Sequence, residues 1–128
     1  MTYIKKYFKK KPGNKYQAKG RNYAGMWFDS TFELNVYQDL EWRLKAGEIK
    51  EIKRQVKIVL TVNGVHITNY FIDFIVTYND GSREYIEAKG FETKDWQIKW
   101  RLLHALIDEI DKGATMTLLK MSSWKRRH

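Results

Sequence analysis

The sequence predicts an α/β domain of the α+β kind, with elements in the order helix, three antiparallel strands, helix and strand. Two stretches carry apolar residues at helical spacing, and between them runs of aromatic and β-branched residues are joined by short turns. A chain of 128 residues can bury one core. We divide it into a basic N-terminal arm (residues 1–25), a core domain (26–121) and a basic tail (122–128).

Residues 30–46 predict the first helix. Ser30 is a suitable N-cap, and Gly47 suits the position after the last turn. The expected apolar stripe consists of Phe32, Val36, Leu40 and Leu44. Glu33 has two interpretations that the spacing leaves open: it can complete a capping box with Ser30, or it can contribute a carboxylate to a site on the sheet.

Three antiparallel strands follow. We expect the charged residues 48–54 to form a solvated connector or edge, and residues 55–62 to form the first strand. Asn63-Gly64 is a strong signal for a two-residue turn, so residues 65–78 should run back as one long strand. The third strand ends at Gly90.

The loop length of the second hairpin decides which sheet face its charged residues occupy. Residues that face each other in an antiparallel pair keep a constant sum of residue numbers. A two-residue loop would place Asp73 opposite Ala88. A three-residue loop over residues 79–81, with a left-handed glycine last, places Asp73 opposite Glu87 and brings Lys89 to the same face.

These three charges predict a metal site. A carboxylate on each strand can hold one hard divalent cation, and the lysine can steer a water molecule or a phosphate. The alternative is a surface hairpin whose charges are merely solvated. Glu-x-Lys occurs four times in the chain, but only the pair Glu87 and Lys89 lies in a strand that follows an Asp-bearing strand and precedes a long helix.

The second helix is predicted by apolar residues that recur at helical spacing between Trp96 and Ile110 and that we assign to the core. Gly113 should end it, and residues 114–121 should form the last strand. Lys94 and Lys99 lie near its start, where a phosphate bound at the hairpin could reach them.

The charge distribution indicates a polyanionic partner. The formal net charge is +9, and residues 1–28 hold eight basic residues and no acidic one. Aromatic residues are interleaved with these basic ones, a composition typical of nucleic-acid binding, although a solvated tail is the alternative. The basic residues are Lys5, Lys6, Lys9, Lys10, Lys11, Lys15, Lys19 and Arg21.

Several classes of protein are excluded by composition. The chain has no cysteine, which removes disulfides, thiolate nucleophiles and cysteine-based zinc sites, and its three histidines lack metal-ligand spacing. No apolar run approaches the ~20 residues of a membrane span, and the basic N-terminus lacks the apolar stretch of a secretory signal. We therefore expect a soluble cytoplasmic protein.

The order of these elements and charges resembles the PD-(D/E)XK nuclease superfamily. Within it, the chain is similar to small phage-encoded nucleases of the endonuclease I type of Holliday junction resolvase. Ile72 stands where the superfamily motif has a proline. The resemblance is carried by residues 28–33, 46–49, 73–74 and 87–90 and by Thr93.

The resemblance implies a restriction-endonuclease-like core with a mixed sheet and a Mg²⁺ site, with Mn²⁺ as a substitute. Asp73, Glu87 and the Ala88 carbonyl would bind the cation with help from Glu33, while Lys89 would orient the attacking water. Gln55 resembles a position that faces the site, and we group it with the DNA-binding candidates. Residues 26–121 would be the nuclease domain.

The implied substrate is branched or junction DNA in the cytoplasm of a phage-infected host cell. One chain has room for one site, whereas resolving a four-way junction needs two nicks, so we expect a homodimer. Two alternatives remain open: another PD-(D/E)XK DNA nuclease, of the end-processing or restriction type, and a non-catalytic nucleic-acid-binding module.

Overall fold

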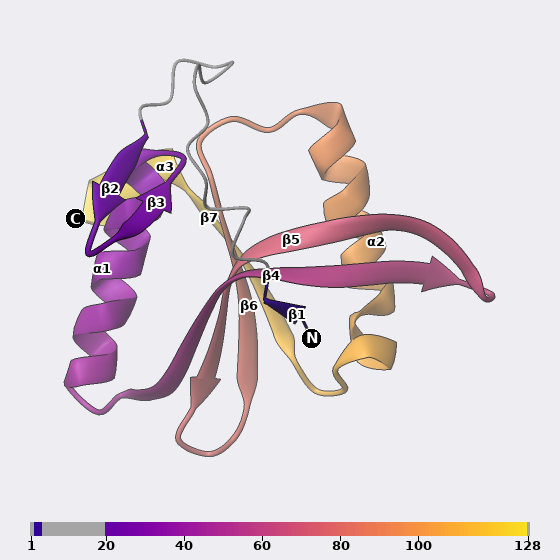
Figure 1. The fold of residues 1–128 in the computed structure, drawn as a ribbon, viewed down its shortest axis with the longest axis horizontal. Coiled ribbons are helices and arrows are strands. Elements are labelled where there is room, and N and C mark those ends of the chain that lie inside the picture. The colour runs from indigo at the N-terminus through magenta and orange to yellow at the C-terminus, as the bar shows by residue number, and fades with distance from the viewer. Residues whose placement is uncertain (1, 4–19, 128) are drawn as a thin grey trace.

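The structure, a computed structural model, describes residues 2–3 and 20–127 (Figure 1). It confirms an α+β fold with a mixed sheet, ordered β1-β4-β5-β6-β7, in which only β7 is parallel to its neighbour. The helices are α1 (Thr31–Lys45), α2 (Lys94–Ile110) and α3 (Met121–Arg127). The strands are β1 (Thr2–Tyr3), β2 (Arg21–Tyr23), β3 (Met26–Phe28), β4 (Ile49–Val62), β5 (Val65–Tyr78), β6 (Arg83–Lys89) and β7 (Thr115–Lys120).

Helix α1 begins and ends as its sequence predicts. The Ser30 hydroxyl accepts a hydrogen bond from the Glu33 backbone N–H at 3.0 Å, and Gly47 has a φ of +79°. Phe32 is buried, but Leu44 is 37% exposed, so the prediction that Leu44 belongs to the stripe is wrong. Each step of four residues turns about 40° beyond a full helical turn, and three steps carry Leu44 away from the core face.

Strand β4 begins at Ile49, so the prediction of a solvated connector over residues 48–54 is wrong. The alternative prediction of an edge is confirmed, because β1 pairs only with Val56 and Lys57 and the residues before them pair with β5 alone among the described strands. The backbone of this segment pairs with β5 from Ile49 onward, with a register shift between Ile49 and Glu51, and exposed charged residues separate its inward-facing ones. Ile49 and Arg54 are buried, whereas Lys50 and Lys53 are exposed. The segment is an amphipathic strand.

The long β4–β5 ribbon changes face in its middle. Phe74 packs in the cluster under α1, whereas Tyr70 and Ile72, also even-numbered, pack in the cluster under α2. A regular strand would keep all three on one face, so the alternation is broken next to Asp73. The facing position on β4 is Gln55, whose φ is +48°. Figure 1 shows one half of the ribbon beside α1 and the other beside α2.

The β5–β6 hairpin has the predicted three-residue loop. The Tyr78 backbone N–H donates to the Ser82 carbonyl at 2.8 Å, and Gly81 has a φ of +87°. The paired residues, from Thr77 with Arg83 to Phe74 with Ile86, keep the constant sum that places Asp73 opposite Glu87. The register prediction is confirmed.

Around β5 and β6, α2 packs on one face of the sheet and α1 and α3 on the other, since Ile75 and Tyr85 join the cluster under α2 whereas Phe74 and Ile86 join the cluster under α1. The Thr93 hydroxyl caps α2 by accepting from the Trp96 N–H at 3.1 Å, and Leu103 and Ile107 are buried as predicted. The residues after β7 form α3 rather than a tail outside the domain. Trp124 is buried with its ring centroid 6.0 Å from that of Phe32.

The N-terminal arm does not end where we placed its boundary. Residues 21–28 form the β2–β3 hairpin, which lies against α1, so a boundary after residue 25 separates β3 from β2 and their turn. The exposed Arg21 belongs to this hairpin. The seven lysines of the arm lie outside the described residues. Among the described helices, none has the length and apolar character needed to cross a membrane.

Candidate active site

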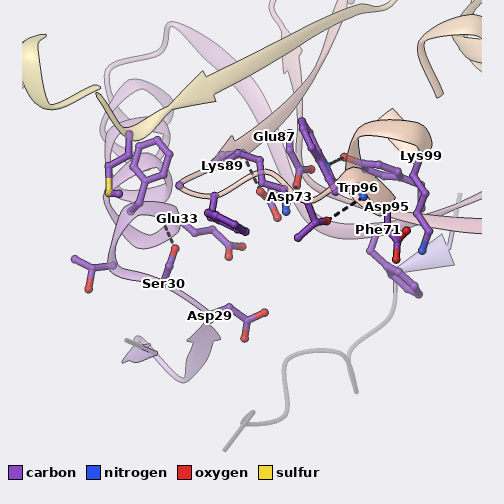
Figure 2. A pocket seen from close by; sticks show the side chains of 18 of the residues that line it. Asp29, Ser30, Glu33, Phe71, Asp73, Glu87, Lys89, Asp95, Trp96 and Lys99 are labelled. Atoms are coloured by element: carbon purple, nitrogen blue, oxygen red, sulfur yellow. Dashed lines mark hydrogen bonds and ion pairs between the residues drawn. The ribbon is translucent and has the colours of Figure 1, made fainter. Parts of the chain in front are cut away.

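A cavity of about 930 Å³ opens between the N-terminal ends of α1 and α2, over the bend in the sheet. Figure 2 shows Glu33 on the α1 side, Trp96 on the α2 side, and Asp73 with Glu87 between them. Lys89 also lines the cavity. The fold thus brings together the four side chains that the sequence predicts as catalytic.

Asp73 and Glu87 lie on neighbouring strands with both carboxylates buried, 8% and 4% exposed. Asp73 accepts hydrogen bonds from the Ala88 backbone N–H at 2.9 Å and from the Gln55 side-chain amide at 3.1 Å. One Glu87 oxygen lies 3.7 Å from the Lys89 ammonium. Each carboxylate is therefore held in place by a neighbour on its own or the adjacent strand.

The Glu33 side chain takes the second of the two roles that the sequence left open. Its backbone N–H donates to the Ser30 hydroxyl at the start of α1, but its carboxylate accepts a hydrogen bond of 2.8 Å from the Gln55 amide. The reciprocal bond of a capping box, from the Ser30 backbone N–H to that carboxylate, is not formed among the described residues. Gln55 thus donates to Glu33 and to Asp73, and it is buried beneath the cavity. Its left-handed backbone, unusual for a residue with a side chain, is strain stored at the site.

Arg54 is a site residue that sequence reasoning missed. It is 3% exposed, and its guanidinium lies 3.6 Å from the Glu33 carboxylate. The same group donates to the Trp27 carbonyl at 3.0 Å and lies 3.7 Å from the centre of the Phe28 ring. The available signal was its spacing of two from Ile52, which assigns both to the inner face of a strand.

Burial controls the electrostatics of the carboxylates. It raises the pKa of Glu33 to about 8, with a further contribution from the charge of Asp73. It raises the pKa of Asp73 to about 6, although the Ala88 N–H and Lys89 oppose the shift. Burial and the charge of Asp73 raise the pKa of Glu87 well above its usual value. Without a bound cation these carboxyl groups are therefore easier to protonate than exposed ones, and a divalent cation would bind in competition with their protons.

The donor set fits a hard divalent cation. One oxygen of Glu87 and the amide oxygen of Gln55 are buried with no hydrogen-bond partner among the residues that the structure describes. Within this part of the chain, no three His, Cys, Asp or Glu side chains are already grouped to hold a metal ion. Mg²⁺ usually takes one or two carboxylates and keeps several water molecules, so Asp73 and Glu87 suffice.

We predict that Glu87→Gln stabilises the metal-free protein by about 0.5–2 kcal/mol, because ionising the buried Glu87 carboxyl beside Asp73 is unfavourable and a neutral amide carries no such cost. Urea unfolding in EDTA measures the effect. Added Mg²⁺ should raise the stability of the parent chain but not that of the variant. A destabilised variant whose unfolding still responds to Mg²⁺ would contradict this assignment.

The remaining candidates lie around the cavity. Lys99 lines it, while Lys94 is exposed at the first position of α2 and does not line it. Trp96 is half-buried as predicted for the core, and its indole N–H donates to the Tyr70 hydroxyl at 2.8 Å. Its ring stacks on that of Trp100, with centroids 5.7 Å apart.

A family model described as "Protein of unknown function (DUF1064)" matches residues 13–123. The chain belongs to this family. No curated protein and no solved structure matches it. The matched range includes every residue that lines the cavity and the whole β2–β3 hairpin.

Proposed function

We propose that this DUF1064 protein is a Mg²⁺-dependent DNA endonuclease of the PD-(D/E)XK kind. The observation that carries the proposal is the buried pair Asp73 and Glu87 at the floor of the cavity, with Lys89 beside it. Two carboxylates and a lysine on adjacent strands are the residue types that phosphodiester hydrolysis needs when no side chain acts as a covalent nucleophile.

Each residue of the site has a separate task in this proposal. Asp73, Glu87 and the Ala88 carbonyl would hold the cation, with Glu33 as a further oxygen donor. A bound Mg²⁺ offsets charge on the phosphate and lowers the pKa of a bound water. The Ala88 N–H and the Gln55 amide fix the orientation of Asp73.

Lys89 and Arg54 act on different sides of the site. The Lys89 ammonium is partly exposed to the cavity and would orient the attacking water or a phosphate oxygen. Arg54 is fully enclosed and holds Glu33 against the sheet through their ion pair. Because Arg54 is also tied to Trp27 and Phe28, the β2–β3 hairpin supports the site from outside.

Within this class, we favour a junction-resolving enzyme that works as a homodimer. The excess of basic residues in the arm, together with Arg21, Lys94 and Lys99, would contact phosphates without reading bases. A two-fold dimer would supply the two nicks that a nearly symmetric four-way junction requires.

Cleavage assays with Mg²⁺ on a four-way junction, a flap and a linear duplex test the proposal. The expected result is symmetric nicking of the junction by a dimer, little cutting of the duplex, and no cutting in EDTA. DNA binding without nicking of any substrate would contradict the nuclease proposal and favour a non-catalytic nucleic-acid-binding module. Equal cutting of duplex and junction, or a monomer on junction DNA, would overturn the resolvase assignment.

We predict that Lys9, Lys10 and Lys11 changed together to Gln weaken DNA binding mainly at low salt. If each contacts one phosphate, the slope of log affinity against log salt falls by about 0.9 per lysine. Fluorescence anisotropy between 50 and 200 mM NaCl, roughly the range in which such effects are large, measures it. The triple change of Lys45, Lys50 and Lys53 to Gln is the control. An equal loss of DNA affinity in both variants would contradict a specific role of the arm in DNA binding.

A further inference from the structure

The cavity has an aromatic side as well as a carboxylate floor. Phe71 of β5, Phe91 of the β6–α2 loop and Trp96 of α2 line it; these three residues are called the aromatic wall below. Phe91 is 57% exposed, an unusual exposure for a phenylalanine beside a charged site. Figure 2 shows Phe71 and Trp96 on the same side of the cavity as Lys99.

Trp96 gives this wall a fixed position. Its ring is stacked on Trp100 and its N–H is bonded to the Tyr70 hydroxyl, so it cannot turn away without losing both contacts. The Lys89 ammonium lies 5.1 Å from the centre of the Trp96 ring. The wall and the proposed catalytic lysine are thus in direct contact.

The composition of the cavity matches the base and the phosphate of a nucleotide. The aromatic wall suits the flat apolar face of a base, and Lys89 and Lys99 suit its phosphate. Asn69 and Asp95 also line the cavity and offer hydrogen-bonding groups to a base edge.

The size and depth of the cavity favour an unpaired nucleotide over a duplex. Its volume of about 930 Å³ lies within the range of pockets that enclose a single small molecule, about 300–1,000 Å³. The carboxylates at its floor are less than one-tenth exposed, so a phosphate must enter the cavity to reach them. A volume of this size accommodates one unpaired nucleotide whose phosphate reaches the carboxylates.

We propose that the aromatic wall stacks one unpaired base of the DNA strand next to the bond that is cut. The inference rests on the proposed nuclease function and narrows its substrate to DNA with an unpaired or extruded nucleotide at the cleavage position. Selectivity for branch points then arises inside the cavity, in addition to any contribution of the basic arm.

The test measures binding of the full chain in EDTA, so that it does not depend on cleavage. The probes are a flap DNA with one unpaired 2-aminopurine at the branch and a duplex with the same base paired. We expect Phe91→Ala to weaken flap binding about 10- to 100-fold and to abolish 2-aminopurine quenching, with duplex affinity unchanged. Phe91→Tyr should restore both, and Trp42→Ala, which removes a 72% exposed aromatic ring outside the cavity, should change neither.

Each outcome separates the two proposals. Phe91→Ala that binds both probes as the parent chain does, or that loses affinity equally for both, overturns the stacking proposal. If Phe91→Ala shows neither selective effect but nicks junctions normally with Mg²⁺, the nuclease proposal stands and only the stacking proposal fails. Selective loss of flap binding and quenching supports stacking even when no DNA is cut, and in that case the nuclease assignment is the one that fails.

Discussion

Asp73→Asn and Glu87→Gln should each reduce DNA cleavage by roughly 10³-fold or more while leaving DNA binding unchanged or tighter. The proposed cation is worth several kcal/mol of charge stabilisation, and each 1.36 kcal/mol is a factor of ten in rate. Both substitutions keep the size of the side chain and remove only its charge. Binding should not weaken, because a neutral amide no longer repels phosphate in the absence of metal.

Glu84→Gln is the matched control for this experiment. Glu84 lies on the same strand as Glu87, and its carboxylate accepts hydrogen bonds from Tyr78 and Thr117 outside the cavity. This variant should cut DNA at the parent rate. Single-turnover cleavage of a junction, with anisotropy in EDTA for binding, measures both properties. Parent-like cleavage by Glu87→Gln would remove the basis of the proposed function.

The position of the carboxylates could be predicted because local rules fix it. Gly81 permits a three-residue loop, and the loop length alone sets which residues of β5 and β6 face each other. The start of α1 was equally accessible, since Ser30 and Glu33 have the spacing of an N-terminal cap. Rules of this kind depend on a few neighbouring residues, so the sequence contains all that they need.

The bend at Asp73 could not be predicted from periodicity. Six of the seven residues from Tyr70 to Val76 are buried, since helices cover both faces of the sheet there. A strand that is apolar on both faces has no alternation from which a change of face could be recognised. The left-handed Gln55 opposite gives no signal either, because glutamine is not typical of that conformation.

Arg54 and Trp124 were missed because their burial depends on distant segments. Arg54 is enclosed by Phe28 and the Trp27 carbonyl, which come from a hairpin that no sequence pattern indicated. Trp124 stands beside basic residues near the end of the chain, and only its contact with Phe32 shows that it belongs to the core. Charge near a residue is therefore weak evidence of exposure when its partner lies far away in the sequence.

Lys89→Met should lose about 10²- to 10³-fold in cleavage rate while retaining Mg²⁺ binding. Donors aimed at charge that develops during reaction contribute on this scale, and the Lys89 ammonium is the partly exposed cation closest to the carboxylates in the cavity. Met has a similar length and is apolar, so it can keep the packing of this side chain near Trp96.

Calorimetry distinguishes this effect from the loss of the metal site. Removing the ammonium that lies 3.7 Å from Glu87 frees that carboxylate, so Mg²⁺ should bind to Lys89→Met at least as tightly as to the parent chain. Glu87→Gln should instead lose the calorimetric signal. Lys120→Met, on the strand position paired with Lys89, is the control and should cut normally. If Lys89→Met cuts at the parent rate, Lys89 does not orient the nucleophile, and another group must perform that task.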